Sequence, residues 1–184
     1  MRITTKAIIS ALALQFAMPA IADENPRQLG AHIHGHGKFN IAIEGGNLAI
    51  ELEIPGMDIV GFEHEPRTKE QKEAIKMAKN SLQNKALSLF VLPEKAGCKL
   101  VSSKVGLPGH DHENDGHGED EKHSEFHAKY EIECSAPAKL TGINFAFFKR
   151  FPKAGELEVS VIGEKNQSVH EVTRRTPMLN VLMK

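Results

Sequence analysis

The chain has 184 residues, a formal net charge of −1, ten histidines, one tyrosine and no tryptophan. A nearly neutral chain lacks the basic surface with which nucleic-acid-binding proteins contact phosphates. The scarcity of tryptophan and tyrosine also leaves little material for stacking on bases or sugars.

The first 22 residues have the layout of a secretory signal peptide. Arg2 and Lys6 form a short basic start, residues 7–17 are apolar, and Ala20-Ile21-Ala22 supplies the small residues of a cleavage site. The apolar run is too short to span a bilayer comfortably, and the alternative is a buried N-terminal helix. We expect cleavage after Ala22, which removes Arg2 and Lys6, changes the formal charge to −3 and leaves residues 23–184 as one exported domain without membrane insertion.

Near the start of the mature chain is the motif "AHIHGHG", in which His32, His34 and His36 occupy alternate positions. Residues two apart in an extended chain project to the same side. The three imidazoles can therefore point toward one place.

A β-hairpin is predicted next, from "KFNIAIEGGNLAIELEIP". Gly45-Gly46 separates two alternating runs and suits a tight turn, because glycine tolerates positive φ. Pro55 ends the second strand. The apolar residues of each strand share one face: Phe39, Ile41 and Ile43 in the first, Leu48, Ile50, Leu52 and Ile54 in the second.

His64 stands in "GFEHEP", between this hairpin and a helix predicted over residues 67–90. Thr68 with Gln71 three residues on fits a capping box at the start of the helix, and Pro93 stops it. The helical spacing of the apolar residues carries the prediction: Ile75, Ala78, Leu82, Ala86 and Leu89.

The remainder reads as strands at residues 98–105, 125–134, 143–148, 156–162 and 168–173. Only one helix separates successive strands, so most pairs should be antiparallel. We predict an α+β fold: a mainly antiparallel sheet or sandwich of six to seven strands with one covering helix.

Cys98 and Cys134 are the only cysteines. In an exported chain such a pair indicates a disulfide. Metal ligation is the alternative, but neither cysteine has a CxxC or CxxH neighbour. The disulfide would close a loop that contains a polar segment at residues 107–124.

This segment is rich in histidine, aspartate and glutamate. It contains most of the run "GHDHENDGHGEDEKHSEFH", which extends from Gly109 to His127. It cannot build a core, and we expect it to be disordered without a ligand. A solvated linker is the alternative interpretation.

Histidine nitrogen binds zinc, copper and nickel, and carboxylates can complete a zinc shell. Because the histidines form groups, we predict metal binding. Zinc is favoured over copper(II) and nickel(II). His170, alone on a C-terminal strand, is expected to be structural or exposed. The candidate metal ligands are His32, His34, His36, His64, His110, His112, His117, His123 and His127.

"AHIHGHGKFNIAIEG", "LEIPGMDIVGFEHEP" and the cysteine-flanked histidine segment resemble the ZrgA-type zinc-binding proteins of the Gram-negative periplasm. The resemblance covers essentially the whole mature chain. It implies periplasmic zinc binding in support of high-affinity import, with the histidines named above as the ligand pool. It implies no catalytic residue.

Two functions of different classes remain at this stage. The first, which we favour over an enzyme, is a binding protein that captures or stores zinc and passes it to the periplasmic component of an ABC importer. The second is a zinc hydrolase with three histidine ligands and an open water position, although "HIHGHG" lacks an HxHxDH continuation and the chain has no HExxH. A nickel or copper tolerance protein shares the chemistry of the first.

Overall fold

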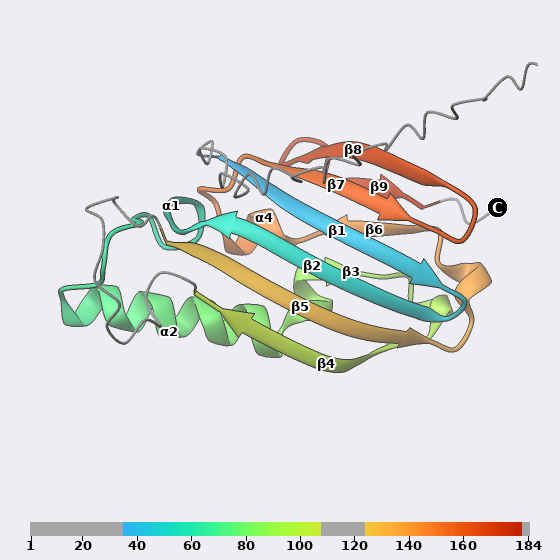
Figure 1. Ribbon diagram of the computed structural model, residues 1–184, viewed down its shortest axis with the longest axis horizontal. Helices are drawn as coiled ribbons and strands as arrows, with labels where there is room; N and C mark the ends of the chain where they lie inside the picture. Colours follow the sequence, from blue (N-terminus) through green and yellow to red (C-terminus); the bar gives the residue numbers. More distant parts are fainter. Residues whose placement is uncertain (1–34, 108–123, 182–184) are drawn as a thin grey trace, which may run out of the picture. The chain divides into compact units, whose positions relative to one another are not determined.

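The computed structural model describes residues 35–107 and 124–181. Six strands form the larger sheet (Figure 1), in the order β4-β5-β2-β1-β7-β8. Neighbouring strands are antiparallel except β1 and β7, which run parallel. The strands are β1 (His36–Glu44), β2 (Asn47–Pro55), β4 (Cys98–Gly106), β5 (Glu125–Cys134), β7 (Glu156–Ile162) and β8 (Gln167–Thr173).

A smaller sheet of three short strands, in the order β3-β6-β9, lies behind the larger one in Figure 1. Its strands are β3 (Phe90–Val91), β6 (Gly142–Phe145) and β9 (Met178–Asn180). The helical elements are α1 (Gly56–Ile59), α2 (Lys69–Asn84), α3 (Ala86–Leu89), α4 (Phe147–Arg150) and the 3-10 turns η1 (Glu94–Ala96) and η2 (Pro137–Lys139).

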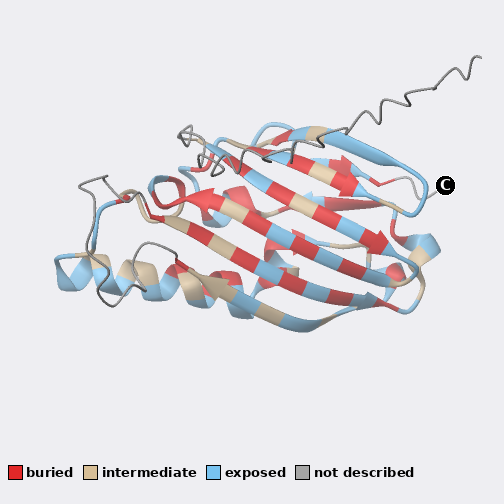
Figure 2. Ribbon diagram, in the orientation of Figure 1, coloured by how far each residue is buried: buried red, intermediate tan, exposed pale blue. Residues whose placement is uncertain are grey.

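The core fills the space between the two sheets. Phe39 of β1 packs on Phe90 and Phe145, with ring centroids 4.5 and 5.1 Å away. The inward face of every central strand is buried, while the outward face is polar and exposed, so Figure 2 shows alternating colours along β1, β2 and β5. This alternation is the one expected of an antiparallel sheet with one face on the core.

The hairpin forms where the sequence predicts it. Gly45 adopts φ +55°, and a Cβ on Gly46 would lie 2.7 Å from the carbonyl oxygen of Cys134. Gly45 therefore supplies the turn conformation, and Gly46 allows β5 to approach closely.

The α+β class, the mainly antiparallel sheet and the apolar faces of the hairpin are confirmed. The described residues contain nine strands, however, and not the six to seven predicted. The two that the prediction lacks are β3 and β9, which have only two and three residues. The predicted helix is interrupted at Lys85, which caps both α2 and α3, and residues 143–148 divide into the end of β6 and the start of α4. The capping box of Thr68 and Gln71 is present.

Candidate metal-binding end of the sheet

Three of the nine candidate ligands, His36, His64 and His127, lie within the described residues. Their placement can be followed directly. The proposed signal peptide and most of the polar segment lie outside the described residues, as do His32, His34, His110, His112, His117 and His123.

The three histidines lie at one end of the larger sheet. At this end β1, β5 and β7 begin, and β2, β4 and β8 finish. His36 begins β1 and is paired with Glu156, the first residue of β7. Pro55 ends β2 opposite Glu125, the first residue of β5, and the last residue of β4 is paired with His127. We call this side the histidine end. With strands about 4.8 Å apart, it spans about 14 Å between β4 and β1.

The segment 56–63 ties the start of β1 to the start of β5. Both carboxylate oxygens of Asp58 accept hydrogen bonds from the backbone N–H of Gly35, at 2.9 and 3.0 Å. The N–H of Gly56 donates to the carbonyl of Ser124, and the N–H of Ser124 donates to the carbonyl of Glu63, at 2.8 and 3.0 Å. The residue that follows His34 and the residue that follows His123 are thus held by one short stretch of chain.

The side chains of these anchors are sequestered from solvent. Asp58, Ser124 and Leu107 are each 2% exposed. Leu107 and Ser124 are the first and last residues of the polar segment, so both of its attachment points are fixed in the folded body at the histidine end.

His36 and His127 lie on the outward face, and each contacts a glutamate. His36 Nδ1 is 3.2 Å from Oε1 of Glu156, and His127 Nε2 is 2.8 Å from Oε2 of Glu125. These glutamates could not be assigned as a set from the sequence. Glu125 stands two residues from His127, a spacing that a strand predicts, but Glu156 reaches His36 through a parallel pair that no local pattern reveals.

His64 lies in the loop between α1 and α2. Its Nδ1 donates to the backbone carbonyl of Glu65 at 2.9 Å, and its ring stacks on Phe62 with centroids 5.1 Å apart. The ring is exposed. Its Nε2 has no hydrogen-bond partner among the described residues and has the lone pair that a metal requires when Nδ1 carries the proton.

Within residues 35–107 and 124–181, no three His, Cys, Asp or Glu side chains are arranged to hold a metal ion. The described histidines each offer one imidazole, and His36 and His127 each have a carboxylate beside them. A tetrahedral zinc site requires more ligands than any of these groups contains.

Cys98 and Cys134 form a disulfide, as predicted. They are directly opposite each other in the β4–β5 pair, at the end of that pair remote from the polar segment. Their sulfurs are therefore committed to each other. A disulfide fits an exported protein.

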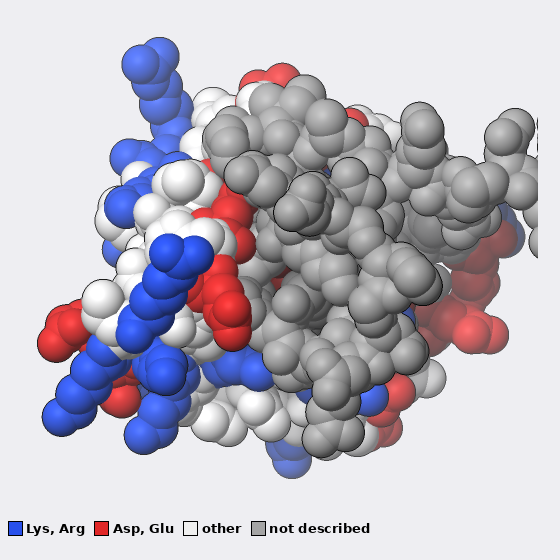
Figure 3. All heavy atoms as spheres, turned by 60° about the vertical axis from the view of Figure 1, so that its left-hand side comes forward, with Lys and Arg blue, Asp and Glu red and all other residues white. Residues whose placement is uncertain are grey.

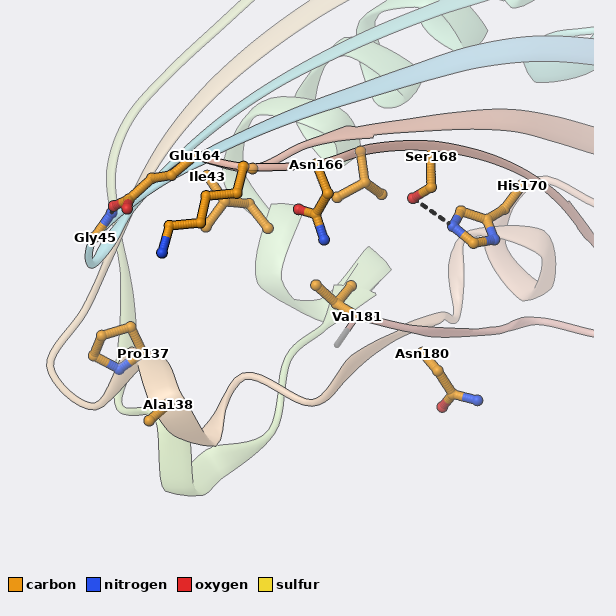
Figure 4. A pocket seen from close by; sticks show the side chains of 13 residues that line it. Ile43, Gly45, Pro137, Ala138, Glu164, Asn166, Ser168, His170, Asn180 and Val181 are labelled. Carbon is orange, nitrogen blue, oxygen red and sulfur yellow. Dashed lines mark hydrogen bonds between the residues drawn. The ribbon is translucent and has the colours of Figure 1, made fainter. Parts of the chain in front are cut away.

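A separate cavity of about 390 Å³ lies at the opposite end of the larger sheet (Figure 4). It is lined by the β1–β2 turn, the β7–β8 turn, η2 and the end of β9. His170 is on its wall, with Nε2 2.8 Å from the hydroxyl of Ser168. A hydroxyl can donate or accept, so this contact does not fix which ring nitrogen of His170 carries the proton.

Figure 3 presents the side of the molecule at the left of Figure 1, where α2 begins. Lysine and arginine side chains gather there beside acidic ones, and the exposed lysines of α2 include Lys69, Lys72 and Lys76. The described part of this face therefore carries charges of both signs. No helix among the described residues is long and apolar enough to cross a membrane.

Comparison with protein families gives a match over residues 31–181, to the family described as ZrgA family zinc uptake protein. The chain belongs to this family. The match includes both attachment points of the polar segment and the whole histidine end. Family membership links the protein to zinc uptake, and it agrees with the resemblance seen in the sequence. No curated protein matches the chain.

Proposed function

We propose that this protein binds zinc in the periplasm, captures or stores it, and supports high-affinity import by passing it to the periplasmic component of an ABC importer. One observation carries the proposal. Segment 56–63 holds Gly35 and Ser124 by backbone and carboxylate hydrogen bonds. Gly35 directly follows His34, and Ser124 directly follows His123, so both of these stretches of the ligand pool are attached at the same end of the sheet.

The ligand pool divides into two groups. The first comprises His36 and His64 of the folded body together with His32 and His34, which precede β1 in the sequence. The second belongs to the polar segment and its exit, at His110, His112, His117, His123 and His127. Both groups are attached at the histidine end, which supports a role in which ions pass between them.

Zinc is the proposed ion because imidazole and carboxylate together suit it, and the disulfide removes the thiolates that soft metals prefer. Copper(II) and nickel(II) bind the same donors. Metal content of the untagged protein, purified directly from the periplasm, separates these possibilities. Zinc as the principal metal is the expected result.

The proposed location requires export. The basic start, the apolar run and Ala20-Ile21-Ala22 support cleavage after Ala22, which leaves residues 23–184 as one metal-binding domain. The intact mass of the periplasmic protein should correspond to a chain that begins at Asp23. A cytoplasmic protein that retains Met1 would contradict this location.

Calorimetric zinc titration of two variants tests the division into groups. Deletion of residues 109–122 leaves six residues between the paired Gly106 and His127, enough to close the β4–β5 hairpin. We expect fewer zinc ions per chain with the tightest one retained. Ordering a free chain costs about 1–2 kcal/mol per residue, so the folded body should supply the tighter site.

The complementary variant replaces His32 and His34 with alanine, and it should weaken the tightest site while the weaker binding remains. His170→Ala is the matched control, because it removes an imidazole in the middle of β8, on the wall of the separate cavity and outside the proposed ligand set. Loss of the tight site on deletion of residues 109–122 would show that the folded body does not hold it. Absence of zinc binding by the intact protein would overturn the proposed function.

A further inference from the structure

Two glutamates outside the proposed ligand set lie against proposed ligands. Glu125 contacts Nε2 of His127 at 2.8 Å, and Glu156 contacts Nδ1 of His36 at 3.2 Å. In both pairs the carboxylate is the less exposed partner. The side chains of Glu125 and Glu156 are 13% and 28% exposed, against 37% and 50% for His127 and His36. The imidazoles therefore lie further out than the groups that hold them.

These contacts determine which ring nitrogen is available. An ionised carboxylate accepts hydrogen bonds and donates none, so the nitrogen that faces it carries the proton. The other nitrogen of the neutral ring then has a free lone pair. For His127 this is Nδ1, and for His36 it is Nε2. Zinc binds such a nitrogen at about 2.0–2.1 Å.

We propose that Glu125 and Glu156 are positioning residues for zinc. Each holds one histidine in the tautomer and ring orientation that present the unprotonated nitrogen outward. The inference rests on the proposed function, since it assigns how two of the proposed ligands are prepared. The two pairs impose opposite tautomers. A general effect of negative charge would not favour one tautomer in His36 and the other in His127, so the individual contacts are required.

Zinc affinity of Glu125→Gln and Glu156→Gln tests the assignment. Glutamine keeps the shape but can donate or accept through its amide, so it no longer fixes the tautomer. Partners of metal-ligating histidines typically contribute about 10-fold to 100-fold to metal affinity. We expect each variant to weaken the zinc site that contains its histidine by about 10-fold or more.

The chain offers matched controls for the loss of one negative charge. Glu133 lies on β5 and Glu158 on β7, both exposed on the outward face, and among the described residues neither has a hydrogen bond or ion pair to a histidine. Glu133→Gln and Glu158→Gln should bind zinc within about twofold of the wild type. Equal weakening in the controls would overturn the assignment to specific contacts.

Nitrogen NMR of the imidazole rings in the zinc-free protein supplies a second measurement. The expected wild-type result is a proton on Nδ1 of His36 and on Nε2 of His127. Glu156→Gln should convert His36 to a mixture of tautomers without affecting His127, and Glu125→Gln should do the reverse.

The outcomes separate this inference from the function on which it rests. If the wild type binds zinc while Glu125→Gln and Glu156→Gln match their controls, the positioning role is wrong and the proposed function stands. Unchanged tautomers in both variants would also overturn the positioning role. If the wild type binds no zinc, the proposed function fails, and the inference fails with it.

Discussion

Asp58 accepts two hydrogen bonds from the single backbone N–H of Gly35, although the two residues are 23 positions apart in the chain. Gly35 has φ +87°, in the left-handed region that L side chains rarely adopt. The carboxylate thus fixes a glycine turn directly before β1.

Asp58→Ala should lower the free energy of unfolding by about 2 kcal/mol, because a hydrogen bond to a charged group is lost and a backbone donor loses its partner. Urea denaturation measures the change, and zinc titration of the same variant should show weaker tight binding. Glu171→Ala on β8 removes an exposed carboxylate and should leave both measurements unchanged. Full stability in Asp58→Ala would contradict the role of this contact.

Tyr130→Phe should stabilise the protein by about 1 kcal/mol. The hydroxyl of Tyr130 is buried and has no hydrogen-bond partner in the part of the chain that the structure describes. The ring itself packs near Phe90, and phenylalanine retains that packing. The inverse control, Phe126→Tyr on the same buried face of β5, should destabilise it. Denaturation midpoints of the two variants should move in opposite directions.

Burial raises the pKa of the Tyr130 hydroxyl well above its usual range, because the phenolate is the form that desolvation disfavours. The unfolded chain releases this proton near pH 10 while the folded chain retains it. Stability should therefore fall as pH rises above about 10, and Tyr130→Phe should lack this part of the fall. Tyr130 is the only tyrosine, so ultraviolet absorbance of tyrosinate reports on it alone. Ionisation of the folded protein near pH 10 would contradict the prediction.

Replacement of Cys98 and Cys134 by serine should lower the free energy of unfolding by about 3–4 kcal/mol, the chain-entropy estimate for a link across this loop. The separation of the two cysteines is 36 residues. Zinc stoichiometry should not change, because the sulfurs are bonded to each other. Denaturation of the double variant tests the first statement, and loss of a bound zinc ion would contradict the second.

Thr68→Ala should cost about 1 kcal/mol through loss of the helix cap. The Thr68 hydroxyl accepts a hydrogen bond from the N–H of Gln71, and the Gln71 side chain accepts one from the N–H of Thr68. Thr68→Ser retains the hydroxyl and is the control. Amide hydrogen exchange should accelerate in the first turn of α2 in the alanine variant alone.

Strands whose two faces differ are the easiest to predict, although β4 and β8, whose faces differ less, also lie within one residue of their predicted bounds. β1, β2, β5 and β7 alternate between apolar and polar residues because one face packs on the core and the other meets solvent, and their bounds follow the pattern closely. β3 and β9 are too short for any period to register. The break at Lys85 was also invisible, because Ala86 and Leu89 continue the apolar spacing of α2 and are buried as predicted.

The candidate site divides in the same way. Composition and spacing are enough to name His36, His64 and His127 as candidate ligands. Their position at one end of one sheet depends on strand order, in particular on β2 lying between β1 and β5, while Glu156 reaches His36 because β7 lies beside β1. Asp58 and Glu156 have no local signature, since their roles come from contacts with residues 23 and 120 positions away.

The β4–β5 hairpin is joined covalently at both of its ends, by the disulfide at one and by the polar segment at the other. A protease that cuts once between Leu107 and Ser124 would therefore not divide the molecule. The two pieces would stay linked through Cys98 and Cys134 and migrate together until a reductant is added. In a compartment that contains proteases, the polar segment could be cut once and every histidine would still belong to one disulfide-linked molecule.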